Sequence, residues 1–364
     1  VTGVQTCALP ILDPEGFVVL PRSGNYLVSD EYGPSLYEFN RSGDLLRSFV
    51  LPANIIPKSS GKIDYLASPN PGSLTSGREG NRGFEGLAVS PDGRFAYAML
   101  QNGTVADGNS SGTSFARSNY SRIVKFDIDS GNAIGQYAYQ LASNSQGISA
   151  LVALDDSRFM VLERNNRGVG VSSNLSSADK KVYIVNINGA SDVSSVNLTS
   201  PLDLSVIPVS KSSFFLNLAA NVLADFNNKS PEKWEGLAVG PRLDDGSYLL
   251  LAGTDNDYSV TQNASNIQFD VYFNPTNGNR RQCDLDAITN CYAIDANGNT
   301  GTANLGTLLS GFQLIPSVLQ AYKVSSADLG GYTSPTAPTP GPLPLLGAIS
   351  AMGWSRRLRR RLKS

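Results

Sequence analysis

The stretch "NRGFEGLAVSPDGRFAYAML", residues 81–100, has the pattern of a β-hairpin that begins with charge. Its two apolar runs, Leu87–Val89 and Phe95–Leu100, favour strands, and the "SPDGR" between them favours a hairpin turn. Arg82 and Glu85 stand directly before the first of these strands. One charged pair at the start of a strand says little, but a pair that recurs at regular spacing would define a site.

The same order of features recurs in three other segments of the chain. They are "DPEGFVVLPRSGNYLVSDEYG" from residue 13, "GISALVALDDSRFMVLERN" from 147, and "KWEGLAVGPRLDDGSYLLLAGTDND" from 233. Each gives an apolar strand, a turn rich in Pro, Asp or Gly, and a second strand that ends in polar residues. Further strands follow, and repeats of three or four strands that cannot bury their own faces predict a β-propeller.

We therefore expect an all-β fold, a propeller of about five or six blades in this chain, with its N-terminal part truncated. A pair of β-sandwiches is the alternative architecture. The composition agrees with an all-β chain, since 35 Gly and 20 Pro among 364 residues favour many turns over long helices. One large propeller suits this length as well as two average domains would.

Charge is unevenly spread along the chain. The formal net charge is −2, but the last 30 residues hold six basic side chains and no acid. The rest of the chain has 23 basic against 31 acidic residues. An acidic body argues against nucleic acid as a partner and favours cations or cation-bridged substrates.

Both ends of the chain differ from the repeats. Residues 1–11, "VTGVQTCALPI", resemble the translation of a sequencing-library adapter, so we exclude them from the fold and expect the signal peptide to be missing. We assign 12–329 to the propeller, 330–342 to a Pro/Gly/Thr linker, and 343–364 to a tail with a short apolar segment and a basic cluster.

The tail resembles a PEP-CTERM sorting signal, with "PTPGP" where that pattern has Pro-Glu-Pro. Its apolar run, Leu343–Trp354, is too short to cross a bilayer comfortably. The resemblance implies export in a Gram-negative-type bacterium, to the cell envelope or the outside, and a sorting or processing protease of the envelope as partner. An amphipathic surface helix is the alternative.

Cys283 and Cys291 stand close together in "CDLDAITNC". A close pair in an exported chain favours a disulfide, and two free thiols are the alternative. A metal site is disfavoured, because the chain has no His and no third Cys outside residues 1–11.

Aligned, the repeats place Glu15, Glu85 and Glu235 at one position, always before Gly, while the third repeat has Ser149 there. The first strand of a propeller blade lines the central channel, so a residue at its start faces the channel mouth. The ends of the second strands add Asp30, Glu31, Glu163, Arg164, Asp255 and Asp257. The repeats thus predict that carboxylates from different blades converge on one face.

Converging carboxylates repel one another. Their repulsion must be relieved by raised pKa values, by arginine or by a divalent cation. Oxygen ligands favour Ca²⁺, with Mg²⁺ also possible. Arg82 and Arg164 either neutralise the acids or bind an anionic substrate in bidentate fashion. For any one acid, the alternative is a structural tie between neighbouring blades.

The blocks "DPEG", "SDEYGPSL", "GNRGFEGLAVSPDG", "VLERN", "KWEGLAVGP" and "TDNDYS" occur in this order over residues 13–325. In these blocks the chain resembles the phytase-like, esterase-like secreted proteins. The resemblance implies a phytase-like β-propeller and hydrolysis of phosphoesters. Carried over to this chain, it implies the catalytic residues Glu85, Glu235, Glu163, Arg82 and Arg164, and the metal ligands Glu15, Glu31, Asp255 and Asp257.

The absence of His excludes a Ser-His-Asp triad and His-based metal centres from this chain. Hydrolysis would then depend on a cation and carboxylates. The leading hypothesis is an exported, metal-dependent monomeric phosphoesterase acting on small molecules. The alternatives are a lactonase or carboxylesterase propeller, and a non-enzymatic binding protein of the envelope stabilised by Ca²⁺.

Overall fold

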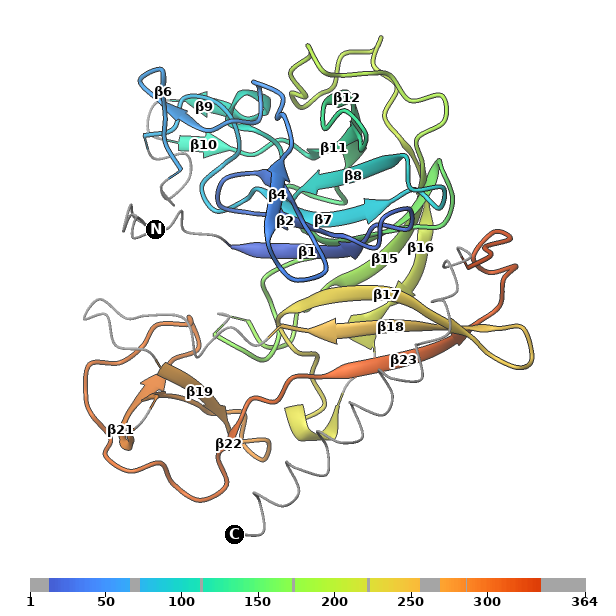
Figure 1. The fold of residues 1–364 in the computed structure, drawn as a ribbon. Helices are drawn as coiled ribbons and strands as arrows, with labels where there is room; N and C mark the ends of the chain where they lie inside the picture. The colour runs from blue at the N-terminus through green and yellow to red at the C-terminus, as the bar shows by residue number, and fades with distance from the viewer. Residues whose placement is uncertain are drawn as a thin grey trace, which may run out of the picture. The chain divides into compact units, whose positions relative to one another are not determined.

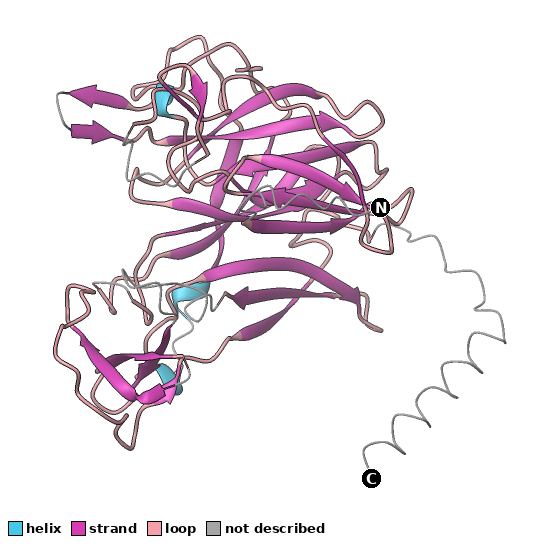
Figure 2. Cartoon of the chain, turned by 60° about the vertical axis from the view of Figure 1, so that its left-hand side comes forward, coloured by secondary structure: helices cyan, strands magenta, loops and turns pink. Residues whose placement is uncertain are grey.

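The computed structural model describes residues 13–65, 73–111, 114–171, 174–220, 223–255, 269–285 and 287–334. Strands dominate this part of the chain (Figure 2). Its helical segments are three short 3₁₀ turns: Val105–Asp107, Leu218–Ala220 and Ala224–Phe226. The all-β fold class predicted from the repeats is confirmed.

Four antiparallel sheets carry the four sequence repeats (Figure 1). The first consists of β1 (Pro14–Val19), β2 (Tyr26–Asp30), β3 (Ser35–Phe39) and β4 (Leu45–Ser48), in this order. The second consists of β7 (Phe84–Val89), β8 (Phe95–Leu100), β11 (Tyr120–Asp127) and β12 (Ala133–Gln140). The third consists of β13 (Gly147–Ala153), β14 (Arg158–Arg164), β15 (Lys180–Asn186) and β16 (Ser210–Asn217), and the fourth of β17 (Trp234–Arg242), β18 (Tyr248–Thr254) and β23 (Leu319–Val324).

The first strands of these sheets are neighbours in space. β7 lies beside both β1 and β13, and β13 lies beside β17. Each sheet is thus a blade whose first strand is innermost and whose later strands step outward, which is the arrangement of a β-propeller. The predicted propeller fold is confirmed.

Glycine permits the inner strands to approach one another. A Cβ on Gly16 would lie 2.4 Å from the Cβ of Leu87 in the next blade. A Cβ on Gly86 would lie 2.8 Å from the Cβ of Leu151, again one blade further on. In the first two blades, the glycine that follows the repeated Glu therefore serves close packing between strands.

Apolar side chains fill the spaces between the blades. Phe84 and Phe126 belong to the core shared by the first two blades. Tyr97 and Phe159 join the second blade to the third, with ring centroids 4.6 Å apart. Trp234, fully buried, lies in the core between the third and fourth blades. Burial of one such side chain contributes about 1.5–3 kcal/mol, so these interfaces hold the blades together.

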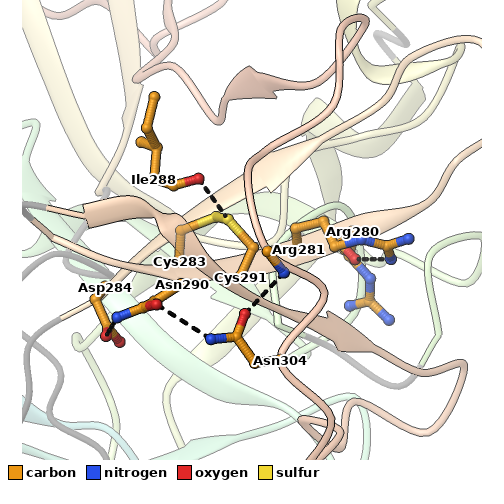
Figure 3. Close-up of a disulfide and its surroundings, with 9 residues drawn as sticks. Arg280, Arg281, Cys283, Asp284, Ile288, Asn290, Cys291 and Asn304 are labelled. Atoms are coloured by element: carbon orange, nitrogen blue, oxygen red, sulfur yellow. Dashed lines mark hydrogen bonds between the residues drawn. A yellow bond between two sulfur atoms is a disulfide. The ribbon is translucent and has the colours of Figure 1, made fainter.

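A further sheet is inserted between β18 and β23. It contains β19 (Phe269–Phe273), β20 (Arg280–Asp284), β21 (Ala287–Ile294) and β22 (Gln313–Leu314). Cys283 and Cys291 face each other across β20 and β21 and are joined as a disulfide (Figure 3). Two small hairpins, β5 (Lys58–Ser59) with β6 (Lys62–Ile63) and β9 (Asn109–Ser111) with β10 (Ser114–Ala116), complete the strands.

Several predictions fall outside the described residues. They concern residues 1–11, the tail at 343–364 and all but the first residues of the linker at 330–342. Within the described ranges, no helix has the length and hydropathy needed to cross a membrane.

Candidate functional site

A β-bulge occurs at the same place in every blade. The ladder between the first and second strands shifts between Pro14 and Phe17, and again between Phe84 and Gly86. It shifts likewise around Ser149 and Glu235. A bulge leaves one residue out of the ladder and turns its side chain to a new direction. The repeated Glu is that residue, which explains why charge is tolerated next to a buried strand.

The second strands present an equivalent position where they end. Pro14, Phe84, Ile148 and Trp234 pair with Asp30, Leu100, Glu163 and Thr254 respectively. The residues that follow these partners, one per blade, are Glu31, Gln101, Arg164 and Asp255. We call these the strand-end residues. The four blades thus contribute a bulge residue and a strand-end residue each.

Most of these side chains line one cavity of about 240 Å³. We call it the acidic cavity; its charged lining residues are Asp13, Glu15, Glu31, Arg82, Glu85, Arg164, Glu232, Lys233 and Glu235. Gln101 and Asn166 also line it. The structure therefore brings together six predicted residues: Glu15, Glu31, Arg82, Glu85, Arg164 and Glu235.

Glu85 is only 4% exposed and is held by a hydrogen-bonded chain of side chains. Gln101 donates its amide N–H to Oε1 of Glu85. Arg82 in turn donates from Nη1 to Oε1 of Gln101 at 2.6 Å and to Oδ1 of Asn102 at 2.6 Å. Oε2 of Glu85 is buried and has no hydrogen-bond partner within the described residues. One carboxylate oxygen is thus oriented while the other stays available.

Glu235 is neutralised by cations. Arg164 pairs with it through Nη2 and donates from Nη1 to Oδ1 of Asn166 at 2.8 Å. Nζ of Lys233 lies 3.7 Å from the same Glu235 oxygen. Burial raises the pKa of Glu235, but Arg164 and Lys233 outweigh burial and hold that pKa below its usual value. Glu235 is therefore an ionised anchor for Arg164.

Three acids on the side of the first blade form a potential cation site. One carboxylate oxygen each from Asp13, Glu15 and Glu31 lies within 4.8 Å of the others. Glu31 is 3% exposed, and its Oε1 has no hydrogen-bond partner in the part of the chain that the structure describes. An orphaned buried carboxylate oxygen beside two others fits a hard divalent ion such as Ca²⁺ or Mg²⁺.

The concentration of buried acids in the cavity makes ionisation of their carboxyl groups unfavourable and raises their pKa values. Burial of its carboxyl, followed by repulsion from Glu85 and Glu235, raises the pKa of Glu15 to about 9, although the residue as a whole is exposed to solvent, which weakens the shift. Burial and the charges of Glu85 and Glu15 raise the pKa of Glu31 well above its usual range. Burial also raises the pKa of Glu85 to about 7, against the attraction of Arg164.

Two predicted residues are not part of the acidic cavity. Glu163 points away from it, because successive residues of β14 face opposite sides and the cavity side belongs to Arg164. Glu163 instead accepts hydrogen bonds from the Tyr139 hydroxyl at 2.8 Å and the Ala142 N–H at 2.7 Å, and it pairs with Lys211 at 2.7 Å. The structure therefore does not bring Glu163 together with the other residues predicted to be catalytic.

Asp255 lies at the edge of the site rather than among the three grouped acids. Its carboxylate is 42% exposed and 3.8 Å from Nζ of Lys233. Asp13, and not the predicted Asp255, is grouped with Glu15 and Glu31. The fourth predicted ligand, Asp257, is outside the described residues.

Sequence reasoning missed Asp13, Gln101, Asn166 and Glu232. Gln101 could have been found by aligning the ends of the second strands, where it is equivalent to Glu31 and Arg164. Asp13 could have been found by aligning the starts of the first strands, where it is equivalent to Lys233. The backbone carbonyl of Asp13 accepts a hydrogen bond from the N–H of Glu31, and that of Lys233 accepts one from the N–H of Asp255. Asn166 and Glu232 come from loops outside the repeat, and no pattern marks them.

The comparisons with known proteins complete these observations. The chain is 27% identical over 315 residues to an uncharacterized secreted protein of Arthroderma benhamiae, covering 72% of this chain and 60% of the relative. The chain thus spans about 60% of the length of this curated relative.

Among solved structures, the β-propeller domain of Cps50 (Swd1) from Myceliophteria thermophila gives a TM-score of 0.29 at 6% identity, covering 85% of this chain and 87% of that one. The WD40 repeats of RRP9 give 0.29 at 8% identity, covering 82% of each chain. TM-scores this low carry no argument about the fold, and the propeller assignment is based on the sheets described above. Residues 6–258 match a family described as "Phytase-like: Esterase-like activity of phytase", and the chain belongs to this family.

Proposed function

We propose that the acidic cavity is the active site of a metal-dependent hydrolase of phosphoesters. The observation that supports this most strongly is the meeting of three adjacent carboxylates with two arginines in one cavity. Membership of an esterase-like family supports a hydrolase in general. The arginines favour a phosphoester over a neutral ester, because guanidinium groups recognise the oxygens of phosphate.

In this proposal Asp13, Glu15 and Glu31 hold the divalent cation. When bound, the cation would supply positive charge that polarises the ester oxygen, lowers the pKa of the attacking water and offsets the negative charge that would otherwise repel a phosphate group.

Glu85 is the proposed general base. In the metal-free protein, burial raises its pKa to about 7, close to the pH at which an acid–base catalyst is most effective. Gln101 orients one oxygen, and the unpartnered Oε2 accepts the proton of the attacking water. The water oxygen bonds to phosphorus, the bond from phosphorus to the ester oxygen breaks, and the leaving alcohol takes up a proton from solvent. Arg82 and Arg164 stabilise the charge on the phosphoryl oxygens.

We also propose that the protein is exported and acts as a monomer on small molecules. The secreted relative and the disulfide support export, since disulfides persist in oxidising compartments. Location in a bacterial envelope and processing of a PEP-CTERM-like tail remain parts of this proposal that rest on the resemblance of residues 343–364.

The test is an assay of the purified chain on three chromogenic esters: p-nitrophenyl phosphate, bis(p-nitrophenyl) phosphate and p-nitrophenyl acetate. Each is run with Ca²⁺, with Mg²⁺ and with a chelator. We expect turnover of a phosphoester that chelation abolishes, and a loss of about 10²–10⁴-fold in kcat for Glu85→Gln. Asp129→Asn, a change in an exposed ion pair with Arg22, is the control and should leave kcat unchanged.

Two outcomes contradict the proposal. Turnover of the acetate alone would favour the lactonase or carboxylesterase reading. Absence of any turnover, with Ca²⁺ only raising the melting temperature, would favour a binding protein.

A further inference from the structure

A buried carboxylate pairs with a residue of the acidic cavity without lining the cavity itself. Glu79 is fully buried and belongs to the loop that leads into β7. Its carboxylate accepts from Nε of Arg117 at 2.6 Å and lies 3.9 Å from Nε of Arg82. Arg82 lines the acidic cavity, whereas Glu79 is not among the lining residues. An effect of Glu79 on the chemistry must therefore pass through a neighbour such as Arg82.

Glu79 offsets the repulsion between two arginines. Burial lowers the pKa of Arg82, and the positive charge of Arg117 lowers that pKa further, while Glu79 acts in the opposite direction. The two guanidinium groups are thus close enough to repel each other across the buried carboxylate. If Glu79 lost its charge, this repulsion would be unopposed by Glu79, and Arg82 would be displaced from its present position.

The backbone of Glu79 is itself held in place. Arg78, which is also fully buried, donates from Nη1 to the carbonyl of Glu79 at 3.0 Å and from Nε to the carbonyl of Tyr32 at 2.6 Å. The backbone of Arg78 forms a β-bridge with Thr104. Buried polar groups that are satisfied in this way rigidify their surroundings. Glu79 is therefore a fixed point relative to which Arg82 is oriented.

The orientation of Arg82 is passed on to the proposed general base. Nη1 of Arg82 donates to Oε1 of Gln101 and to Oδ1 of Asn102. With its oxygen bound to Arg82, the side-chain amide of Gln101 presents its N–H to Glu85. A turned amide would place its oxygen against the carboxylate of Glu85 and repel it. Glu79, Arg82, Gln101 and Glu85 thus form one chain of interacting side chains.

We propose that Glu79 is a positioning residue: it holds Arg82, and through Arg82 and Gln101 it keeps the general base Glu85 in its working orientation. This inference rests on the proposed function. It gives a role in the reaction to a buried acid that stands before the strands of the second repeat and does not line the acidic cavity.

The first test is kinetic. Glu79→Gln removes the charge of the side chain and keeps its size, and kcat is measured on p-nitrophenyl phosphate and bis(p-nitrophenyl) phosphate. We expect kcat to fall by about ten- to hundredfold, because small displacements of catalytic groups cost this much. In an Arg82→Gln background the same change should cost less than about twofold, since Glu79 then has no Arg82 to hold. Equal losses in both backgrounds, or a wild-type kcat in Glu79→Gln, overturn the proposal.

Glu38→Gln is the matched control. Glu38 pairs with Nε of Arg47 at 2.7 Å, so a buried carboxylate again meets a partly buried arginine, and neither residue lines the acidic cavity. This variant should lose stability and keep the wild-type kcat in its folded fraction. A loss of kcat as large as that of Glu79→Gln would be a general effect of broken ion pairs and would overturn the proposal.

If Glu79→Gln does not fold, Glu79→Asp takes its place. This change keeps the charge but draws it back by one methylene group, so kcat should still fall by about threefold or more. An unchanged kcat in Glu79→Asp overturns the proposal.

If neither substrate is hydrolysed, the proposed function is wrong, and a structural measurement decides the positioning role separately. Hydrogen exchange of the Gln101 side-chain amide is followed by NMR. The amide should be protected in the wild type and in Glu38→Gln, and it should exchange faster by about tenfold or more in the folded Glu79 variant. Equal exchange rates in the wild type and the Glu79 variant overturn the proposal.

Discussion

At the scale of the residue, Glu85 is the proposed general base, and its protonation links the acidic cavity to the stability of the fold. In the metal-free protein its folded pKa is about 7 and that of Glu15 about 9, both above the value of 4.5 for an unperturbed Glu. A group with a raised folded pKa stabilises the fold fully below its unfolded pKa and loses that contribution as the pH rises through the folded pKa.

We therefore expect the metal-free chain to lose stability between pH 5 and pH 9. Glu85→Gln removes one of the titrating groups, so its melting temperature should fall less between pH 5 and pH 8 than that of the wild type. Thermal unfolding over a pH series in a chelating buffer checks this. Superimposable pH profiles for the two proteins would refute the assignment of the raised pKa to Glu85.

Glu163, one residue away from the site residue Arg164, has a structural role instead. Removing its charge leaves Lys211 without its partner beside Tyr139. Breaking a buried ion pair in this way costs about 3 kcal/mol.

Glu163→Gln should accordingly lower the free energy of unfolding by about 3 kcal/mol, as measured by urea denaturation. The kcat of the folded fraction should stay at the wild-type value. If Glu163→Gln kept the wild-type stability but lost most of its kcat, Glu163 would belong to the catalytic cluster after all.

At the scale of the element, the Glu of the repeated Glu-Gly pair lies in a β-bulge, and in the second blade the Gly permits a close contact between neighbouring inner strands. Gly86 leaves no room for a Cβ, which would meet Leu151 at 2.8 Å. Gly236 is the equivalent glycine of the fourth blade, yet the nearest atom to its Cβ would be 3.6 Å away, an ordinary contact. The two positions form a matched pair with the same sequence motif and different packing.

Gly86→Ala should destabilise the fold by about 1–3 kcal/mol, since β7 and β13 must move apart. Gly236→Ala should be close to neutral. Urea denaturation of the two variants beside the wild type gives the comparison. Equal costs at both positions would contradict the role of Gly86 in strand packing.

At the scale of the whole molecule, the repeats predicted the all-β propeller and the convergence of Glu15, Glu85 and Glu235. This was possible because a fourfold recurrence of strand, turn and strand constrains the arrangement of blades. The repeats could not predict that Glu163 faces away from the acidic cavity, because one residue of register decides the side and the bulge shifts that register. Nor could they predict Asn166 and Glu232, which lie in loops outside the repeat that meet at the bridge between Val169 and Pro231.

The central claim is that acids on the first blade hold a divalent cation inside the acidic cavity. Calorimetric titration of Ca²⁺ into the metal-free chain tests it most directly, with Glu31→Gln as the variant and Asp129→Asn as the surface control. We predict one saturable site in the wild type and the control, and binding weaker by about tenfold or more in Glu31→Gln. Ca²⁺ affinity that Glu31→Gln leaves unchanged, or no binding to the wild type, would contradict the account.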